Sequence, residues 1–343
     1  MSLRNPLAIA AVLLAASVGL ATPARAQTTV VKLATLVPDG SVWDKILRDM
    51  GAEWAKATQG RVVLRIYPGG VAGDEPDIVR KMRIGQIQAA ALTTTGLSSI
   101  DPGFSVFNIP MMFDSYDELA AVLETMQPLF KQRLEAKGFV LLNWGHGGWV
   151  HIFTKQPVRT VAELKKCKLF AWAGNDRMVQ MWKANGFQPV PLAATDILTG
   201  LSTGMIDAFP TPPVAALAMQ WFRSTPYMVD LGLGPLVGGL IVTRTAWDKI
   251  SQADRAAVQA ICARAEQRLA YEVPRQDTLS VEEMTKRGLT VAKVPPTAVA
   301  EWRAEAEQFA AGMRGEIVPA EVLDLARRER DAFRQRGTPR GGR

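Results

Sequence analysis

Two hydrophobic periods alternate along the first third of the chain. Residues 30–36, 62–67 and 87–92 are apolar runs of strand length, and the first two are rich in β-branched side chains. Residues 41–58 open with a serine that can cap a helix, and 77–84 carry apolar side chains at helical spacing. The order strand, helix, strand, helix, strand predicts an α/β fold with a largely parallel sheet.

The same alternation starts again at Gly148. The expected strands and helices, in chain order, are 149–154, 161–165, 168–172, 176–185 and 190–192. Residues 236–243 are apolar and return to a sheet, and 246–286 are mostly helical. This last segment is either one helix that runs along both halves of the molecule or two helices broken at Pro274.

Part of the first half is repeated in the second half. Residues 77–89 align without gaps to 196–208, and each copy predicts a helix, a terminal glycine and a short buried strand. Small or polar residues follow each strand, namely Thr93, Thr94 and Thr95 in the first copy and Thr211 and Pro212 in the second. Ligands of open α/β sheets bind outside the carboxyl ends of the strands. We therefore expect two similar lobes with a binding site between them.

The length of the chain also favours two lobes, because 343 residues exceed what one hydrophobic core usually holds. The predicted division is 1–26 as a leader, 27–147 plus about 236–275 as the first lobe, 148–235 plus about 276–325 as the second lobe, and 326–343 as a basic, disordered tail.

The N-terminal residues have the three parts of a signal peptide. Arg4 supplies a positive charge, 7–21 are apolar, and Ala24-Arg25-Ala26 is a small-x-small cleavage site. A retained membrane anchor is the alternative, but the apolar run is short for a bilayer span. We expect cleavage after Ala26, export to the periplasm, and a mature protein that is soluble and monomeric.

Charge and cysteine content change this picture little. The net charge is +7, and the excess lies in the arginine-rich C-terminus. A patch that binds nucleic acid is the more specific interpretation of that cluster, and a polar tail is the simpler one. An exported protein does not routinely meet nucleic acid, so we favour the tail. Cys167 and Cys262 are more simply two free thiols than a disulfide, although the periplasm permits one.

The sequence contains no motif of an enzyme, a metal site or a cofactor. His146 and His151 are its only histidines and lack partners at ligand spacing. Gly145-His146-Gly147-Gly148 has no nucleophile motif to serve and is interpreted as a flexible crossover between lobes. Asp74 and Glu75 are either a carboxylate pair or part of a solvated loop. We predict no catalytic residue, metal or cofactor.

Five segments, in their order and spacing, resemble the DctP-type substrate-binding proteins of tripartite ATP-independent periplasmic (TRAP) transporters. They are Lys32-Leu33-Ala34-Thr35, Tyr67-Pro68-Gly69-Gly70 with the later Arg83-Ile84-Gly85-Gln86-Ile87, Ile109-Pro110-Met111-Met112-Phe113, Thr160-Val161-Ala162-Glu163-Leu164-Lys165, and 201–208. The resemblance implies a two-lobe periplasmic-binding-protein fold, in which each lobe is a mostly parallel sheet flanked by helices, with a long connecting helix. It also implies closure on a small organic ligand and delivery to a small and a large membrane permease subunit.

The chain departs from this family at one position. The strand that usually carries a carboxylate-binding arginine is 168–172, and Phe170 occupies the arginine position. A second position often filled by arginine lies near Val150, which is also apolar. Without a bidentate arginine, burying a carboxylate is costly. The sequence thus favours a neutral, aromatic or lipophilic ligand, or an acid held by helix N-termini and hydroxyls.

The expected ligand-binding residues are aromatic or hydroxyl-bearing side chains and their neighbours at predicted strand ends. They are Trp43, Thr93, Thr94, Thr95, Trp144, Trp149, Phe170, Trp172, Asn175, Asp176, Thr211 and Pro212. Two other functions compete with that of a transport receptor. One is a periplasmic sensor or scaffold without a transport partner, and the other is an enzyme that uses the same cleft.

Overall fold

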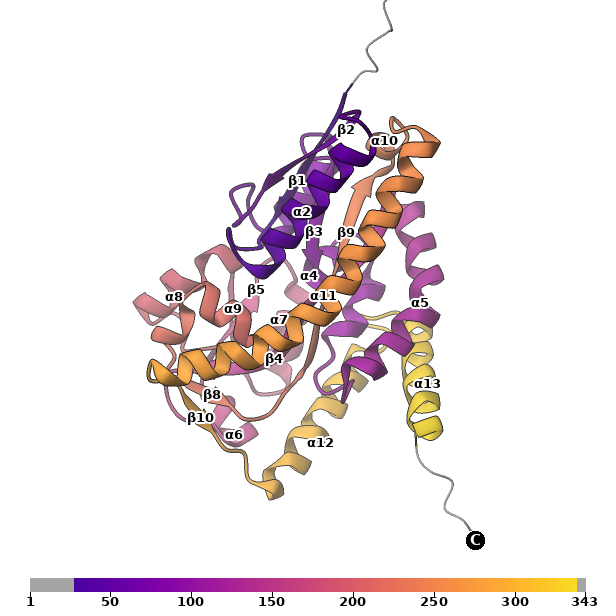
Figure 1. The fold of residues 1–343 in the computed structure, drawn as a ribbon. Helices are drawn as coiled ribbons and strands as arrows, with labels where there is room; N and C mark the ends of the chain where they lie inside the picture. The colour runs from indigo at the N-terminus through magenta and orange to yellow at the C-terminus, as the bar shows by residue number, and fades with distance from the viewer. Residues whose placement is uncertain (1–27, 338–343) are drawn as a thin grey trace, which may run out of the picture.

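Strands from both halves of the chain build the first of two sheets. The computed structural model describes residues 28–337 (Figure 1). The first sheet has the order β2 (Val62–Tyr67), β1 (Thr29–Thr35), β3 (Ala89–Thr93), β9 (Gly234–Thr243) and β4 (Phe139–Thr154). Strand β1 is parallel to β2 and β3, whereas β9 is antiparallel to β3 and β4. The carboxyl ends of β1 and β3 therefore meet at one edge.

Strand β4 continues from the first sheet into the second. There it pairs with β7 (Ala208–Thr211) and β8 (Tyr227–Val229). Strand β5 (Lys168–Trp172) is parallel to β7 and to β6 (Gln188–Leu192), and β10 (Thr290–Ala292) is parallel to β8. Each lobe is thus a mixed sheet whose consecutive β-α-β units are parallel, and helices flank it (Figure 1).

The crossover between the lobes is a bulged strand. The pairing of β4 with β9 shifts register between Leu141 and Asn143 and between His146 and Gly148. Gly148 has a backbone φ of 110°, which residues other than glycine rarely adopt. Backbone hydrogen bonds to β9 continue through the expected crossover, so it is a paired strand with two bulges. Its position between the lobes is as expected.

Helices cover the sheets on both sides. The helices of the first half are α2 (Val42–Ala57), α3 (Glu75–Arg83), α4 (Thr94–Ser98), α5 (Tyr116–Ala136), α6 (Val161–Leu164) and α7 (Asp176–Ala184), with the 3₁₀ turn η1 (Pro102–Asn108). Those of the second half are α8 (Ile197–Thr203), α9 (Pro213–Ala218), α10 (Arg244–Trp247), α11 (Gln252–Lys286), α12 (Pro296–Met313) and α13 (Ala320–Gly337), with η2 (Ala194–Asp196) and η3 (Trp221–Arg223). Serine or threonine caps begin α2, α5 and α6, and the Ser41 cap of α2 is the one that the sequence predicted.

One long helix joins the two lobes. Helix α11 runs for 35 residues and retains Pro274 in its interior, so the alternative of two helices broken there is wrong. Figure 1 shows it in orange, crossing from the second lobe to the far end of the first. Val258, Ile261 and Leu269 pack into the core beneath α2, while Met284 packs into the second lobe. The helix is therefore anchored in both hydrophobic cores.

The repeat predicted from the sequence has a structural counterpart. Gly85 follows α3 with a φ of 75°, and Gly204 follows α8 with a φ of 74°. Each glycine leads into a buried strand of its own lobe, β3 or β7. The two copies thus form equivalent helix–glycine–strand units.

The C-terminal residues correct one expectation. Helix α13 continues to Gly337, so the prediction of a disordered tail from 326 is wrong as far as 337. Val322, Leu323 and Ala326 are fully buried on one face of α13, which packs against α5 in the first lobe. Burial of this apolar face outweighs the repulsion of the arginines. Residues 338–343 and the expected signal peptide lie outside the described residues.

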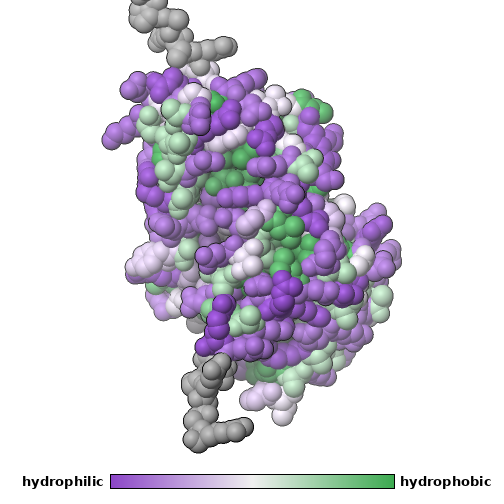
Figure 2. Space-filling model, turned by 90° about the vertical axis from the view of Figure 1, so that its right-hand side faces the viewer, coloured by the Kyte–Doolittle hydropathy of each residue, from purple (hydrophilic) through white to green (hydrophobic). Residues whose placement is uncertain are grey.

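The arginines of this region are paired with acids. Arg327 bonds Glu307 at 2.7 Å, and Arg334 bonds Asp114 at 3.0 Å. Figure 2, which views the side carrying α5 and α13, shows a mostly hydrophilic surface with separate hydrophobic patches. Between residues 28 and 337, no helix has both the length and the apolar character that crossing a bilayer requires. Cys167 and Cys262 are free thiols.

Candidate functional site

A cavity of about 320 Å³ lies between the two lobes. The first lobe contributes the end of β1, side chains of α2 and α3, and the end of β3. The second lobe contributes β5, the end of β7 and the turns around them, and β4, β9 and Leu269 of α11 complete the wall. The carboxyl ends of parallel strands thus face the cavity from both sides, as expected for open α/β sheets.

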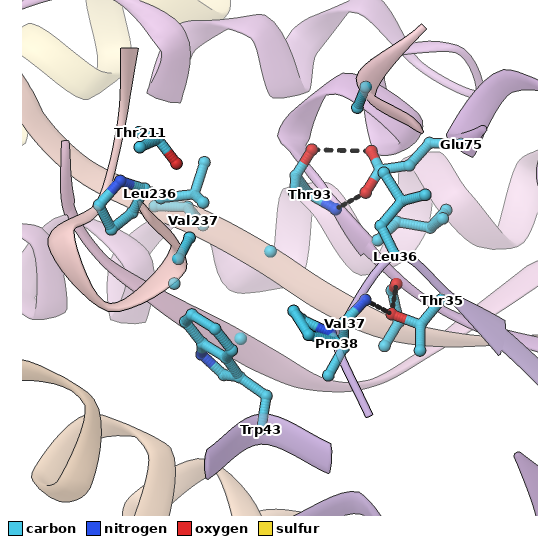
Figure 3. Close-up of a pocket in the computed structure, with 18 of the residues that line it drawn as sticks. Thr35, Leu36, Val37, Pro38, Trp43, Glu75, Thr93, Thr211, Leu236 and Val237 are labelled. Carbon is cyan, nitrogen blue, oxygen red and sulfur yellow. Dashed lines mark hydrogen bonds between the residues drawn. The ribbon is translucent and has the colours of Figure 1, made fainter. Parts of the chain in front are cut away.

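Half of the expected site residues line this cavity. They are Trp43, Thr93, Phe170, Trp172, Thr211 and Pro212. Trp43 points toward the cavity in Figure 3, and its Nε1 donates a hydrogen bond of 3.0 Å to the carbonyl of His146. Phe170 lies 5.7 Å from the Trp172 ring, centroid to centroid, in an edge arrangement. Aromatic side chains therefore approach the cavity from both lobes.

Three of the expected residues serve the interior or the second lobe instead. Trp144 is 1% exposed and packs among the rings of Phe104, Phe107 and Phe130 in the first core. Asn175 caps α7 by accepting a hydrogen bond from the amide of Met178. Asp176 forms the first turn of the same helix. Their expected ligand contacts are not supported, because the local hydrogen bonds and core packing place them away from the cavity.

The remaining three expected residues also lie outside this cavity. Thr94 is buried and bonds Asn108, while the amide of Thr95 donates to the Thr93 hydroxyl. Trp149 lines a separate depression at the crossover. There the centroid of its ring lies 5.1 Å from the centroid of the Tyr116 ring, in an edge arrangement. Adjacent residues of a strand point to opposite faces, so Val150 faces the main cavity and Trp149 does not.

Among the described residues that line the cavity, none is an arginine or a lysine. The ionisable side chains there are Glu75 and His146. Burial lowers the pKa of His146, which makes the neutral imidazole the main form at pH 7. The cavity therefore offers apolar and aromatic surface, hydroxyl groups and one acid, but no fixed positive charge.

Glu75 is a residue that the sequence reasoning did not place in the site. Its Oε1 accepts a bond of 2.7 Å from the Thr93 amide, and its Oε2 accepts a bond of 2.7 Å from the Thr93 hydroxyl (Figure 3). The same Oε2 also accepts a bond of 2.7 Å from the Gly96 amide. The side chain is buried, and burial raises its pKa to about 7 against the opposing effect of these bonds. The solvated-loop interpretation of Asp74 and Glu75 is wrong, because both are buried. The sequence signal that could have placed Glu75 at a helix start is Pro76, because proline favours the first turn of a helix.

A second acid lies at the crossover, outside the main cavity. Asp277 of α11 accepts bonds from the amide of Trp149 at 2.6 Å and from the amide of Val214 at 3.1 Å. Burial raises its pKa to about 6. Asp277 thus ties the connecting helix to the interlobe strand and to the start of α9. Residues 28–337 contain no group of His, Cys, Asp or Glu side chains arranged to hold a metal ion.

A two-lobe α/β fold with a long connecting helix and an interlobe cavity defines a periplasmic-type binding protein. Residues 33–314 match the family described as "DctP: Bacterial extracellular solute-binding protein, family 7", and the chain belongs to this family. The match covers most of the chain, as the resemblance of the five sequence segments predicted.

Three curated relatives each share about a quarter of their aligned residues with this chain. A solute-binding protein of Chromohalobacter salexigens is 26% identical over 66% of this chain and 69% of its own length. The ectoine/5-hydroxyectoine-binding periplasmic protein UehA of Ruegeria pomeroyi is 26% identical over 63% and 65%. The C4-dicarboxylate-binding periplasmic protein DctP of Rhodobacter capsulatus is 23% identical over 68% and 71%.

Solved structures share the fold over nearly the whole length. DctP7 of Bordetella pertussis, an extracytoplasmic solute receptor binding pyroglutamic acid, superposes with a TM-score of 0.80 at 23% identity, covering 88% of this chain and all of that chain. The sugar acid binding protein DctPAm of Advenella mimigardefordensis, in complex with galactonate, gives a TM-score of 0.83 at 16% identity, covering 89% and 99%. At this identity the likeness extends to the fold alone.

Proposed function

We propose that this protein is the extracytoplasmic solute receptor of a TRAP transporter. It closes its two lobes on a small organic ligand in the periplasm and delivers the ligand to the small and large permease subunits, and it is not an enzyme. Membership of the solute-binding family and the interlobe cavity support this proposal. An export signal over residues 1–26, cleaved after Ala26, is part of the same proposal.

We further propose that the ligand is neutral, aromatic or lipophilic. The observation that carries this proposal is the lining of the cavity, in which no described residue is an arginine or lysine and Phe170 stands at the expected arginine position. A buried carboxylate without such a partner would lose several kcal/mol of solvation. Aromatic walls bury about 150–250 Å² per ring and favour a ligand with an apolar body.

An organic acid bound without arginine is the second candidate. It is favoured by the acids in two similar folds, pyroglutamic acid in DctP7 and galactonate in DctPAm. In this chain the hydroxyl of Thr211 is a neutral polar group of the cavity wall that could donate to such an acid, whereas the Thr93 hydroxyl already donates to Glu75. Native mass spectrometry of the purified protein, followed by denaturing extraction, distinguishes the two. A low-polarity compound supports the apolar ligand, and a hydroxy acid or dicarboxylate contradicts it.

Phe170→Arg tests the placement of the missing charge. The variant should bind pyroglutamate or galactonate at least about ten-fold more tightly than the unaltered protein, because a charge-assisted pair replaces apolar contact. Calorimetric titration measures the gain, and Phe170→Leu is the control for disturbance of the wall. Binding that does not improve in a folded Phe170→Arg variant would show that position 170 does not face a ligand carboxylate.

A further inference from the structure

One carboxylate joins the two lobes beside the cavity. Asp74 lies in the first lobe, at the N-cap of α3, where its Oδ1 accepts a bond of 2.8 Å from the Glu75 amide. Its Oδ2 accepts two bonds of 2.9 Å, from the indole Nε1 of Trp172 and from the amide of Ala194. Trp172 ends β5 and Ala194 begins η2, so both of these donors belong to the second lobe.

These bonds act on the cavity wall directly. Trp172, Ala194 and the neighbouring Glu75 all line the cavity, and Asp74 is itself only 7% exposed. The indole bond fixes the orientation of the Trp172 ring beside Phe170. If the lobes separated, Asp74 would keep its bond to Glu75 within α3 and lose both bonds to the second lobe.

The surrounding chain brings the lobes close together at the same place. A Cβ built on Gly70 would lie 2.8 Å from Cγ2 of Thr195, the residue after Ala194. Gly70 also has a φ of 74°, so both the space and the backbone require glycine here. The loop before α3 and the turn at η2 are thus in van der Waals contact around Asp74.

We propose that Asp74 is a positioning residue that latches the second lobe to the first and holds Trp172 as a wall of the closed cavity. Its role in retaining a ligand rests on the proposed receptor function, but the latch itself is a property of the protein alone. The carboxylate accepts from three N–H donors, and its charge makes each of these bonds stronger than a bond to a neutral acceptor. Asparagine has one acceptor oxygen, so its amide hydrogens must face at least one of the three donors.

Hydrogen exchange at the Trp172 indole tests the latch without a ligand. The chain has nine tryptophans, so the protein is labelled with ¹⁵N at the indole, and the Trp172 signal is assigned by its loss in Trp172→Phe. In the unaltered protein the Trp172 indole proton should exchange at least about ten-fold more slowly than in Asp74→Asn, given the strength of a bond to a charged acceptor. Asparagine still caps α3, so the helix should persist.

Two further variants separate the latch from a general loss of stability. Asp74→Ser keeps a capping oxygen but is too short to reach Trp172, and it should also release the indole proton. Asp77→Asn removes an exposed acid of the same helix, which bonds Arg80 at 2.8 Å, and should leave exchange unchanged. Rapid exchange in the unaltered protein, or equal exchange in the unaltered protein and Asp74→Ser, overturns the proposal.

The same variants also distinguish the latch from the receptor function. When pyroglutamate, galactonate or an extracted compound binds, it should dissociate about ten-fold faster from Asp74→Asn than from the unaltered protein, because the bonds from Trp172 and Ala194 that hold the lobes together around it are weakened. An intact latch in a protein that binds no solute would refute the receptor function alone. Solute binding with an unprotected indole would refute the latch alone.

Discussion

At the scale of single residues, the described wall of the cavity carries one acid, Glu75, and no arginine or lysine. Glu75 is satisfied by three donors from Thr93 and Gly96, yet it has no positively charged partner among the described cavity residues. These bonds fix the turn from β3 into α4, so the carboxyl group has a structural role in shaping the wall. Its protonation state sets whether the wall is neutral or negative.

The raised pKa of Glu75 makes a prediction about stability. The folded pKa is about 7 against an ordinary value of 4.5, so folding favours the protonated form. This contribution is fully present below pH 4.5 and is lost as pH rises through 7. The unaltered protein should therefore lose up to about 3 kcal/mol over this range relative to Glu75→Gln. Urea unfolding at successive pH values measures the difference, with the exposed Glu124→Gln as control. A difference that does not vary with pH contradicts it.

The sequence predicted that aromatic and hydroxyl-bearing side chains surround the site, but only half of the individual residues that it selected line the cavity. Trp43 and Trp144 were both expected in the site, but Trp43 lines the cavity and Trp144 fills a core. The residue type does not distinguish them, because the difference depends on which elements pack around each ring. Phe170 and Trp172 could be placed through the resemblance, whereas Glu75 was missed because its burial is created by β3 and α4, distant in sequence.

At the scale of elements, local signals fixed most helices and strands of the two α/β units. The predicted strand at 62–67 coincides with β2, and the predicted helix at 41–58 differs from α2 by one residue at each end. Caps, glycines and apolar periodicity determine such elements locally. The C-terminal helices were harder to place, since arginines alternate there with few apolar residues. Only the face of α5 explains why Val322, Leu323 and Ala326 are buried.

Helix α13 should therefore contribute to stability through its apolar face. Ala326→Asp places a charge at a fully buried position against α5, and it should destabilise the protein by about 3 kcal/mol or more. Arg328→Ala changes an exposed position of the same helix and should change stability by less than about 0.5 kcal/mol. Equal stabilities of the two variants in urea would mean that α13 does not pack as described.

At the scale of the whole molecule, the two lobes are joined at three kinds of contact. The bulged strand β4 crosses between them, α11 is anchored in both cores, and the Asp74 latch closes the side of the cavity. Asp277 links the first two of these by binding the amides of Trp149 and Val214. A change at this junction should alter the angle between the lobes.

Gly148 is the position where that junction is tightest. A Cβ there would lie 2.5 Å from Oδ2 of Asp277 and 2.7 Å from Cβ of Pro212, and the φ of 110° is unfavourable for alanine. Gly148→Ala should destabilise the protein by about 3 kcal/mol, partly by displacing the Asp277 carboxylate from the Trp149 amide. It should also change the radius of gyration in small-angle X-ray scattering, because the strand and the connecting helix must separate.

The matched control is Gly138→Ala, which has a similar backbone cost and no clash. Gly138 has a φ of 84°, and nothing lies within 4 Å of a Cβ built there. That variant should lose about 1–2 kcal/mol from backbone strain alone and keep the radius of gyration of the unaltered protein. If both variants change stability equally and neither changes the scattering, Asp277 does not control the relation between the lobes. If only Gly148→Ala opens the molecule, closure depends on the junction of β4 with α11 as well as on the Asp74 latch.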